Sequence, residues 1–216
     1  MLYKIAHILR DHCGWIWELA EGANSLAFRI RYASGLKRIP HVLEKYNTEE
    51  LCVRVAEVGD AEALAAFFAQ QPEEDFTYFR PHDFDVQTLR KLLGRTSFLM
   101  FVVEPLKPSE TPETLKPSET LEPPLYGYFF LRSFVHGQSY LGKMVDHEHQ
   151  GRGIGKLMCK AAMDVALCLG VRMFESINRK NMASMRSTGA VLKQVILDEL
   201  EHGDLLIEDL PLEDPQ

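Results

Sequence analysis

The sequence predicts a mixed α/β fold, an α+β arrangement around a mixed sheet, with a helical extension at the N-terminus. Short segments with the two-residue alternation of strands are interleaved with longer segments whose apolar residues recur every three or four positions. The third and fourth strand segments are joined directly, which suits an antiparallel pair and therefore a mixed sheet. Residues 1–23 show helical periodicity alone, so we divide the chain into an extension, 1–50, and a main domain, 51–212.

Composition excludes several classes of protein. A length of 216 residues with 46% hydrophobic content suits one domain with an appendage and a buried core. No apolar run is long enough for a membrane span, and charged residues interrupt the first 20 positions, so we expect a cytoplasmic protein without a signal peptide. The net charge of −7, without a long basic run, disfavours nucleic acid as a partner. The four cysteines form no Cys-x-x-Cys pair, which predicts reduced thiols and no metal site.

The extension begins with a predicted helix over residues 1–23, whose apolar stripe includes Ile5, Ile8, Leu9 and Ile16. Residues 24–38 fit either a strand or a helix and are locally basic. One interpretation is an interfacial membrane helix beside a basic patch. The other, which we favour, is a helical extension packed on the domain or on a second subunit, so a homodimer stays open and a membrane partner is disfavoured.

The first half of the domain predicts two strands and two helices. A helix follows Asp60 and another follows Asp85, and both aspartates are plausible N-caps. The segment between the two helices is irregular and aromatic-rich. The predicted elements are a strand Val53–Val58, a helix ending at Gln70, a helix Val86–Leu93 and a strand Phe98–Glu104.

Residues 105–124 differ in kind from the rest of the chain. LKPSETPET at 106–114 is followed by LKPSETLEP at 115–123, a tandem duplication rich in Pro, Ser, Thr and Glu. Such a segment cannot bury enough apolar surface to offset its ordering entropy. We therefore expect a disordered loop insertion between two strands.

The second half predicts five more strand segments after this loop and one long helix. The helix ends near Leu169, with Gly170 at the C′ position. The final two strands form a hairpin that turns at residues 201–204. The predicted strands are Leu125–Arg132, Ser139–Val145, Arg172–Asn178, Val191–Glu199 and Leu205–Leu210.

A glycine-rich segment, Gln150-Gly151-Arg152-Gly153-Ile154-Gly155, joins a predicted strand to this long helix. The free N–H groups of a helix start, together with the positive end of the helix dipole, suit a phosphate or pyrophosphate. The spacing fits neither the Walker loop nor the Gly-x-Gly-x-x-Gly dinucleotide fingerprint. The alternative is a helix start that uses glycine for packing.

The segment resembles the pyrophosphate loop of the GNAT acetyltransferases, Gln/Arg-x-x-Gly-x-Gly/Ala, at Gln150, Gly153 and Gly155. The order of the downstream elements is also similar, and the resemblance covers about residues 52–210. It implies a GNAT-like acyl-CoA N-acyltransferase fold with acetyl-CoA as co-substrate. It further implies transfer of an acetyl group to a primary amine, on a small molecule or a peptide, by direct attack in a ternary complex.

The resemblance also assigns cofactor-binding residues. Backbone groups of the fourth strand would contact the pantetheine arm, N–H groups of the glycine loop would hold the pyrophosphate, and an asparagine would contact the cofactor. The residues so assigned are Lys143, Met144, Val145, Gln150, Gly151, Arg152, Gly153, Ile154, Gly155, Lys156 and Asn181.

The catalytic groups stay open. Candidates for the general base are Glu175, His147, His149 and Tyr140, with surface or core roles as the alternatives. Many family members have a tyrosine as general acid in the helix after the fifth strand, but residues 181–190 contain none. Thr188 stands near that place, and water is a further candidate for the acid.

The aromatic-rich segment between the first two helices of the domain is the candidate acceptor wall. Its side chains combine apolar contact with polar selection, the alternative being aromatic packing beneath a loop. The candidate substrate residues are Tyr78, Phe79, His82 and Asp83. Because the usual tyrosine is missing, a catalytically weak or inactive GNAT-like acyl-CoA-binding module, with a regulatory or interaction role, is the competing function.

Overall fold

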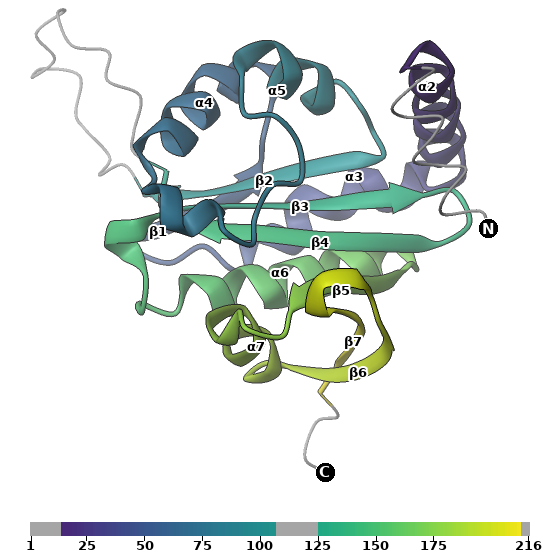
Figure 1. The fold of residues 1–216 in the computed structure, drawn as a ribbon. Helices are drawn as coiled ribbons and strands as arrows, with labels where there is room; N and C mark the ends of the chain where they lie inside the picture. The colour runs from purple at the N-terminus through teal and green to yellow at the C-terminus, as the bar shows by residue number, and fades with distance from the viewer. Residues whose placement is uncertain (1–13, 107–124, 213–216) are drawn as a thin grey trace, which may run out of the picture.

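The computed structural model describes residues 14–106 and 125–212. Within them lies a seven-stranded sheet of order β1-β2-β3-β4-β5-β7-β6, shown in Figure 1. Every neighbouring pair is antiparallel except β4 and β5, which confirms the predicted mixed sheet. The strands are β1 Leu51–Val55, β2 Phe98–Pro105, β3 Gly127–Phe134, β4 Gln138–Val145, β5 Arg172–Asn178, β6 Leu192–Glu199 and β7 Asp204–Pro211.

Helices cover both faces of the sheet (Figure 1). Helices α4 and α5 lie on one face, and α3 and α6 lie on the other. None of the helices in the described ranges combines the length and apolarity that a bilayer span needs. The helices are α2 Gly14–Arg31, α3 Ala33–Glu44, α4 Ala61–Gln70, α5 Val86–Leu93, α6 Ile154–Leu169 and α7 Met182–Gly189, with 3-10 turns η1 Val58–Asp60, η2 Glu73–Phe76, η3 His147–His149 and η4 Glu201–Gly203.

The core has two layers because the central strands are buried on both faces. In β2, Met100 and Val102 pack with α4 and α5, whereas Phe101 and Val103 pack with α3 and α6. Since successive side chains of a strand point to opposite faces, both sets must be apolar. This accounts for the continuous apolar run of β2, which a strand with one solvated face would not need.

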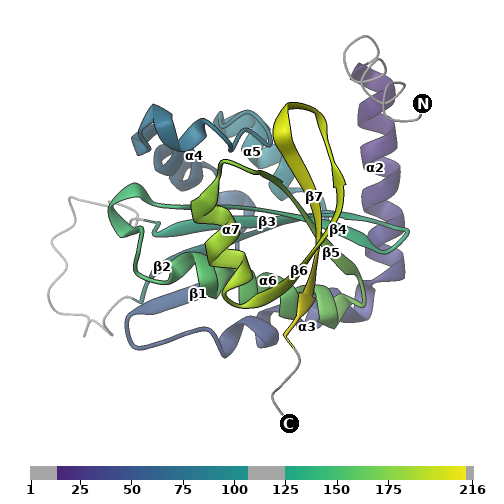
Figure 2. The same ribbon diagram turned by 60° about the horizontal axis from the view of Figure 1, so that its bottom comes forward.

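The N-terminal extension is helical as far as it is described, so the ambiguity over residues 24–38 resolves as helix. Ile39 and Leu43 of α3 belong to the same buried cluster as the sheet and α6. Helix α2 stands at the end of the sheet near the β3–β4 turn (Figure 2). There Asn24 Nδ2 donates to the Ser133 carbonyl over 2.9 Å, and its Oδ1 accepts from the Val135 N–H over 3.0 Å.

Some predicted features lie outside the described residues, namely Ile5, Ile8 and Leu9 of the N-terminal stripe and the tandem repeat from residue 107 to 123. Ile16, the fourth member of that stripe, is half-buried.

Both predicted aspartates occupy N-cap positions, but only one of them makes a capping hydrogen bond with its side chain. Asp85 caps α5, because its Oδ1 accepts the Thr88 N–H over 3.0 Å. Asp60 does not cap α4 with its side chain. Its carboxylate instead accepts two hydrogen bonds from Arg54, of 2.8 and 2.9 Å, and one from the Glu57 N–H. The physical reason is that Asp60 is also the last residue of the turn η1, which lies between β1 and α4, so its carboxylate bonds within that turn and to Arg54. Strand β1 ends at Val55, three residues before the predicted end.

Candidate active site

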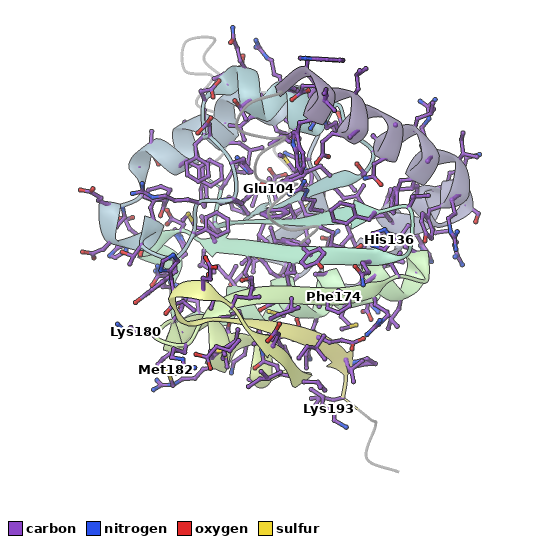
Figure 3. The ribbon with its side chains drawn as sticks, turned by 45° about the vertical axis from the view of Figure 1, so that its right-hand side comes forward. Glu104, His136, Phe174, Lys180, Met182 and Lys193 are labelled. Atoms are coloured by element: carbon purple, nitrogen blue, oxygen red, sulfur yellow. The ribbon has the colours of Figure 1, made fainter. Side chains whose placement is uncertain are left out.

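The parallel strands β4 and β5 pair over only three residues. Gln138–Tyr140 lie opposite Arg172–Phe174, whereas β3 stays paired with β4 up to Val145. Beyond Tyr140, β4 therefore has no strand partner on the side that faces β5. A cleft of about 690 Å³ opens between the two strands there. In Figure 3, Phe174 marks the last pair, and Lys180 and Met182 mark the far end of β5, where α7 begins.

Five parts of the chain line this cleft. The second half of β4 and the end of β5 form its two sides. The glycine loop and the start of α6 lie at one mouth of the cleft, with α7 next to them. The segment around η2 contributes the remaining lining residues. The lining residues are Leu141, Gly142, Lys143, Met144, Val145, Gln150, Gly151, Gly153, Ile154, Gly155, Lys156, Glu175, Ser176, Ile177, Asn178, Asn181, Ala183, Ser184, Arg186, Ser187, Glu74, Asp75, Tyr78 and Phe79.

The glycine loop turns through two left-handed residues. Gly151 has φ 76° and Gly153 has φ 85°, and a Cβ at either position would meet no atom within 4 Å. Glycine is therefore required by the backbone conformation and not by crowding. Gly153 is the N-cap of α6 and supplies no side chain to the first turn. The free N–H groups of this helix start lie at the cleft, with the positive end of the helix dipole, and can bind an anion.

Two side-chain cations stand beside the loop. Lys156 on α6 and Arg186 on α7 are exposed and line the cleft. Arg186 was missed by the sequence reasoning, because nothing in the sequence orients α7 relative to the loop. Arg152, which was expected here, does not line the cleft, since its guanidinium donates to the Glu148 carbonyl over 3.2 Å. Asn181 lines the cleft and also caps α7, with its Oδ1 accepting from the Ser184 N–H.

A buried ion pair crosses the cleft where β4 and β5 part. Lys143 Nζ donates to Glu175 Oε1 and to Thr188 Oγ1, each over 2.9 Å. The side chains of Lys143 and Glu175 are only 8% and 2% exposed. Burial by itself lowers the pKa of Lys143, but the adjacent Glu175 carboxylate outweighs it, so the pKa is raised and the ammonium stays charged.

Asp209 of β7 lies behind this pair. Its side chain is buried, and within the described residues neither carboxyl oxygen has a hydrogen-bond partner. Burial, with the nearby Glu175 carboxylate as a second cause, raises the pKa of Asp209 to about 8. At neutral pH the charged part of this cluster is therefore one ammonium and one carboxylate.

The structure separates the candidates for the general base. Glu175 lines the cleft but is tied to Lys143. Tyr140 lies at the last β4–β5 pair and stacks on Phe174, with ring centroids 5.6 Å apart. His149 bonds to Asp146 and stacks on Tyr126. His147 reaches the rim only through Asp75, to which its Nδ1 is bonded over 3.0 Å.

The structure brings two of the four candidate acceptor-wall residues to the cleft. Tyr78 and Phe79 line the cleft, whereas His82 and Asp83 do not. His82 Nε2 contacts the hydroxyl of the buried Tyr128 over 3.0 Å, so it belongs to the packed layer beneath the loop. Burial lowers the pKa of His82, which favours the neutral imidazole in that layer. Asp83 is simply exposed to solvent.

Two carboxylates at the cleft were missed. Glu74 and Asp75 of η2 line it beside the aromatic residues. The acidic run at 73–75, directly before Phe76, was the available signal. Asp75 also accepts a weak contact from Gln150 Nε2, 3.3 Å away, so η2 is connected to the glycine loop.

No group of His, Cys, Asp and Glu side chains in residues 14–106 and 125–212 is arranged to hold a metal ion. Cys52, Cys159 and Cys168 are free thiols, and Cys13 lies outside the described residues.

No protein-family model matches the chain, and no curated protein sequence matches it either. Its structure is nevertheless similar to solved acetyltransferases. The GNAT domain of S. lividans PAT matches with a TM-score of 0.57 at 18% identity, over 74% of this chain and 90% of that one. The ribosomal-protein-S5-alanine acetyltransferase from Vibrio fischeri matches with 0.58 at 14% identity, over 79% and 97%. Mycobacterium smegmatis RimJ, in complex with CoA-disulfide, matches with 0.55 at 16%, over 77% and 84%. The chain therefore has the GNAT fold, which confirms the fold predicted from the glycine loop.

Proposed function

We propose that this protein transfers an acetyl group from acetyl-CoA to a primary amine, by direct attack in a ternary complex. One observation carries the proposal: the uncapped, glycine-rich start of α6 lies at the mouth of the gap between β4 and β5. An anion site and a free strand edge thus meet in one cleft. A CoA molecule has a pyrophosphate for the first and a chain of amides for the second.

Binding of acetyl-CoA uses both features. The N–H groups from Gly151 to Lys156 hold the pyrophosphate, and the Lys156 and Arg186 side chains add positive charge. The backbone of Lys143, Met144 and Val145 pairs with the pantetheine amides along the edge of β4 that β5 leaves open. Such pairing adds a ligand to a sheet edge in the manner of an extra strand.

The reaction forms a C–N bond and breaks the thioester C–S bond. A neutral amine attacks the thioester carbon and the carbonyl oxygen becomes an oxyanion. As the oxyanion collapses, the sulfur leaves as a thiolate, the nitrogen loses a proton to give the amide, and the thiolate takes up a proton. A β4 backbone N–H and the permanently charged Lys143 ammonium stabilise the developing negative charge. Lys143 cannot act as the base, since its raised pKa keeps it protonated.

Proton removal from the amine goes through water to the pair of Asp75 and His147 at the rim. Asp75 lines the cleft, and His147 is in contact with both Asp75 and solvent, with 48% of its side chain exposed. Glu175 supports the site indirectly, by holding Lys143 at the apex of the cleft.

The acceptor is a cationic small amine. Glu74 and Asp75 present negative charge on the acceptor side, and Tyr78 and Phe79 present aromatic surfaces beside them. Carboxylates and aromatic faces both attract ammonium groups. An acceptor with a second positive charge, remote from the reacting amine, satisfies this arrangement.

Two alanine substitutions of equal strain test the assignment. Gly153 and Gly170 both have positive φ and open space for a Cβ, but only Gly153 lies at the cleft. Gly153→Ala and Gly170→Ala each cost ~1–2 kcal/mol of stability, because an L-residue resists this conformation. Calorimetry with CoA is expected to show weaker binding for Gly153→Ala alone. Unchanged CoA affinity in Gly153→Ala would refute the pyrophosphate site.

A second function is favoured by one specific observation. The segment from Asn181 to Ala190 has no tyrosine to protonate the thiolate, and Thr188 is buried behind Lys143 instead of lining the cleft. The protein would then be an acyl-CoA-binding module with little or no turnover. Thiol release measured with a panel of amines, including diamines and polyamines, separates the two. CoA binding without thiol release for any amine supports the module.

A further inference from the structure

Helix α2 presents an apolar stripe to solvent. Trp15, Leu19, Leu26 and Ile30 are 69%, 64%, 52% and 71% exposed. At 3.6 residues per turn these four side chains lie within an arc of ~60°, with Ala23 close by. The opposite side of the helix packs on the protein, since Phe28 is completely buried. Scattered exposed apolar residues are ordinary, but a continuous stripe of large ones marks an interaction surface.

The stripe has a two-fold pattern about the point between Gly22 and Ala23. Leu19 and Leu26 lie at equal distances from that point, and so do Trp15 and Ile30. The smallest side chains are at the centre, and a Cβ on Gly22 would meet nothing within 4 Å. A symmetric dimer needs a self-complementary surface of this kind.

We propose that this stripe is the contact surface between two copies of the chain, with their α2 helices antiparallel across a two-fold axis at residues 22 and 23. Leu19 of each copy packs on Leu26 of the other, and Trp15 packs on Ile30. Gly22 and Ala23 let the two helix axes approach closely where they cross. The interaxial distance of packed helices depends on the side chains at the contact.

The area of the stripe suits a weak but specific dimer. Large apolar side chains have ~150–250 Å² of surface when aromatic and somewhat less when aliphatic. At the observed exposures, the four residues leave on the order of 500 Å² uncovered per copy. Two copies therefore bury roughly 1,000 Å², which is the lower limit for a biological interface.

The two-fold pattern favours a second copy over a lipid surface. Glu18, on one edge of the stripe, pairs with Lys91 and Arg95 of its own chain, so its carboxylate is not what selects a partner. The partner is selected by the apolar residues, because Leu19 and Leu26, and likewise Trp15 and Ile30, lie at equal distances from the centre of the stripe. A bilayer surface has no two-fold axis to match this pattern, whereas a second copy of the chain does.

Sedimentation velocity of the full chain over a concentration series tests the proposal. Wild type is expected to pass from monomer to dimer as concentration rises, whereas Leu19→Glu/Leu26→Glu stays monomeric to on the order of 100 µM. Because both leucines are exposed, the variant keeps its fold, which circular dichroism checks. A wild type that is monomeric at every concentration overturns the proposal, as does a dimer that the double variant leaves intact.

Cross-linking tests the geometry with a matched control, in a Cys13→Ser background. Gly22→Cys lies at the proposed axis and is expected to link two copies upon mild oxidation. Arg31→Cys, on the same helix, is far from its own copy in the antiparallel pair and is expected not to link. Equal linking of both variants overturns the antiparallel arrangement. Quantitative co-flotation of a monomeric protein with phosphatidylserine-containing vesicles would assign the stripe to a membrane instead.

Discussion

The buried pair of Lys143 and Glu175 gives the sharpest prediction, because each charge depends on the other. Glu175→Gln removes the carboxylate that is bonded to the buried Lys143 ammonium and leaves it the hydrogen bond to Thr188, with Asp209 as a nearby acidic group. Removing one partner of a buried ion pair typically costs ~3–5 kcal/mol, since the remaining charge stays desolvated. We expect Glu175→Gln to lower the free energy of unfolding by about that amount. The lower half of the range applies if the Nζ of Lys143 moves towards the cleft and its water.

The double variant Lys143→Met/Glu175→Gln completes the cycle. Replacing a buried pair by uncharged groups of similar volume is often neutral or stabilising. We therefore expect the double variant to be at least ~2 kcal/mol more stable than Glu175→Gln alone, giving a coupling energy far above the ~0.2–1 kcal/mol of exposed pairs. The exposed pair of Arg172 and Glu208, joined by hydrogen bonds of 2.6 and 2.7 Å, is the matched control.

Urea unfolding followed by circular dichroism at pH 7 measures all four members of each cycle. The coupling energy follows from the midpoints if the slopes stay equal. A coupling energy for Lys143 and Glu175 no larger than that for Arg172 and Glu208 would refute the reasoning. It would mean that water in the cleft solvates both groups well enough to make the pair dispensable.

Three further predictions concern single groups. Asp209 has a pKa raised from 3.8 to about 8, so its stabilising contribution is complete below pH 3.8 and is lost as pH rises through about 8. In urea unfolding, wild type is expected to lose ~1–3 kcal/mol more stability between pH 6 and pH 8.5 than Asp209→Asn does. An identical pH dependence in the two proteins would contradict the raised pKa. Glu74→Gln is expected to raise KM for a cationic amine roughly two- to fivefold without changing CoA affinity. Glu73→Gln, on the same turn but outside the cleft, is the control and leaves both unchanged. Equal kinetics of the two variants would place the acceptor elsewhere. Arg186→Ala is expected to weaken CoA binding and to reduce the salt dependence of that binding. Lys180 does not line the cleft, so Lys180→Ala is the control. An equal loss of CoA affinity in both variants would indicate a general charge effect.

Local chemistry allowed much of the fold to be read in advance. Some features depend on only a few neighbouring residues and can therefore be predicted from the sequence. These are the αL glycine at residue 170, the Asp85 cap and the alternation along the strands. The glycine loop is of the same kind, because a turn through two positive φ values followed by a helix start needs glycine at particular positions. The direct joining of β3 and β4 was enough to predict a mixed sheet.

Only the tertiary structure decided which side chains meet. His82 and Asp83 are adjacent to the aromatic wall in sequence, yet one packs on Tyr128 and the other faces solvent. Lys143 and Glu175 are 32 residues apart on different strands, and their pairing depends on where the β4–β5 ladder ends. Arg186 and the α2 stripe were hidden for the same reason. The sequence sets the periodicity and the chemistry of each element, but the side chains that an element presents to a cleft or to solvent depend on how it packs against all the others.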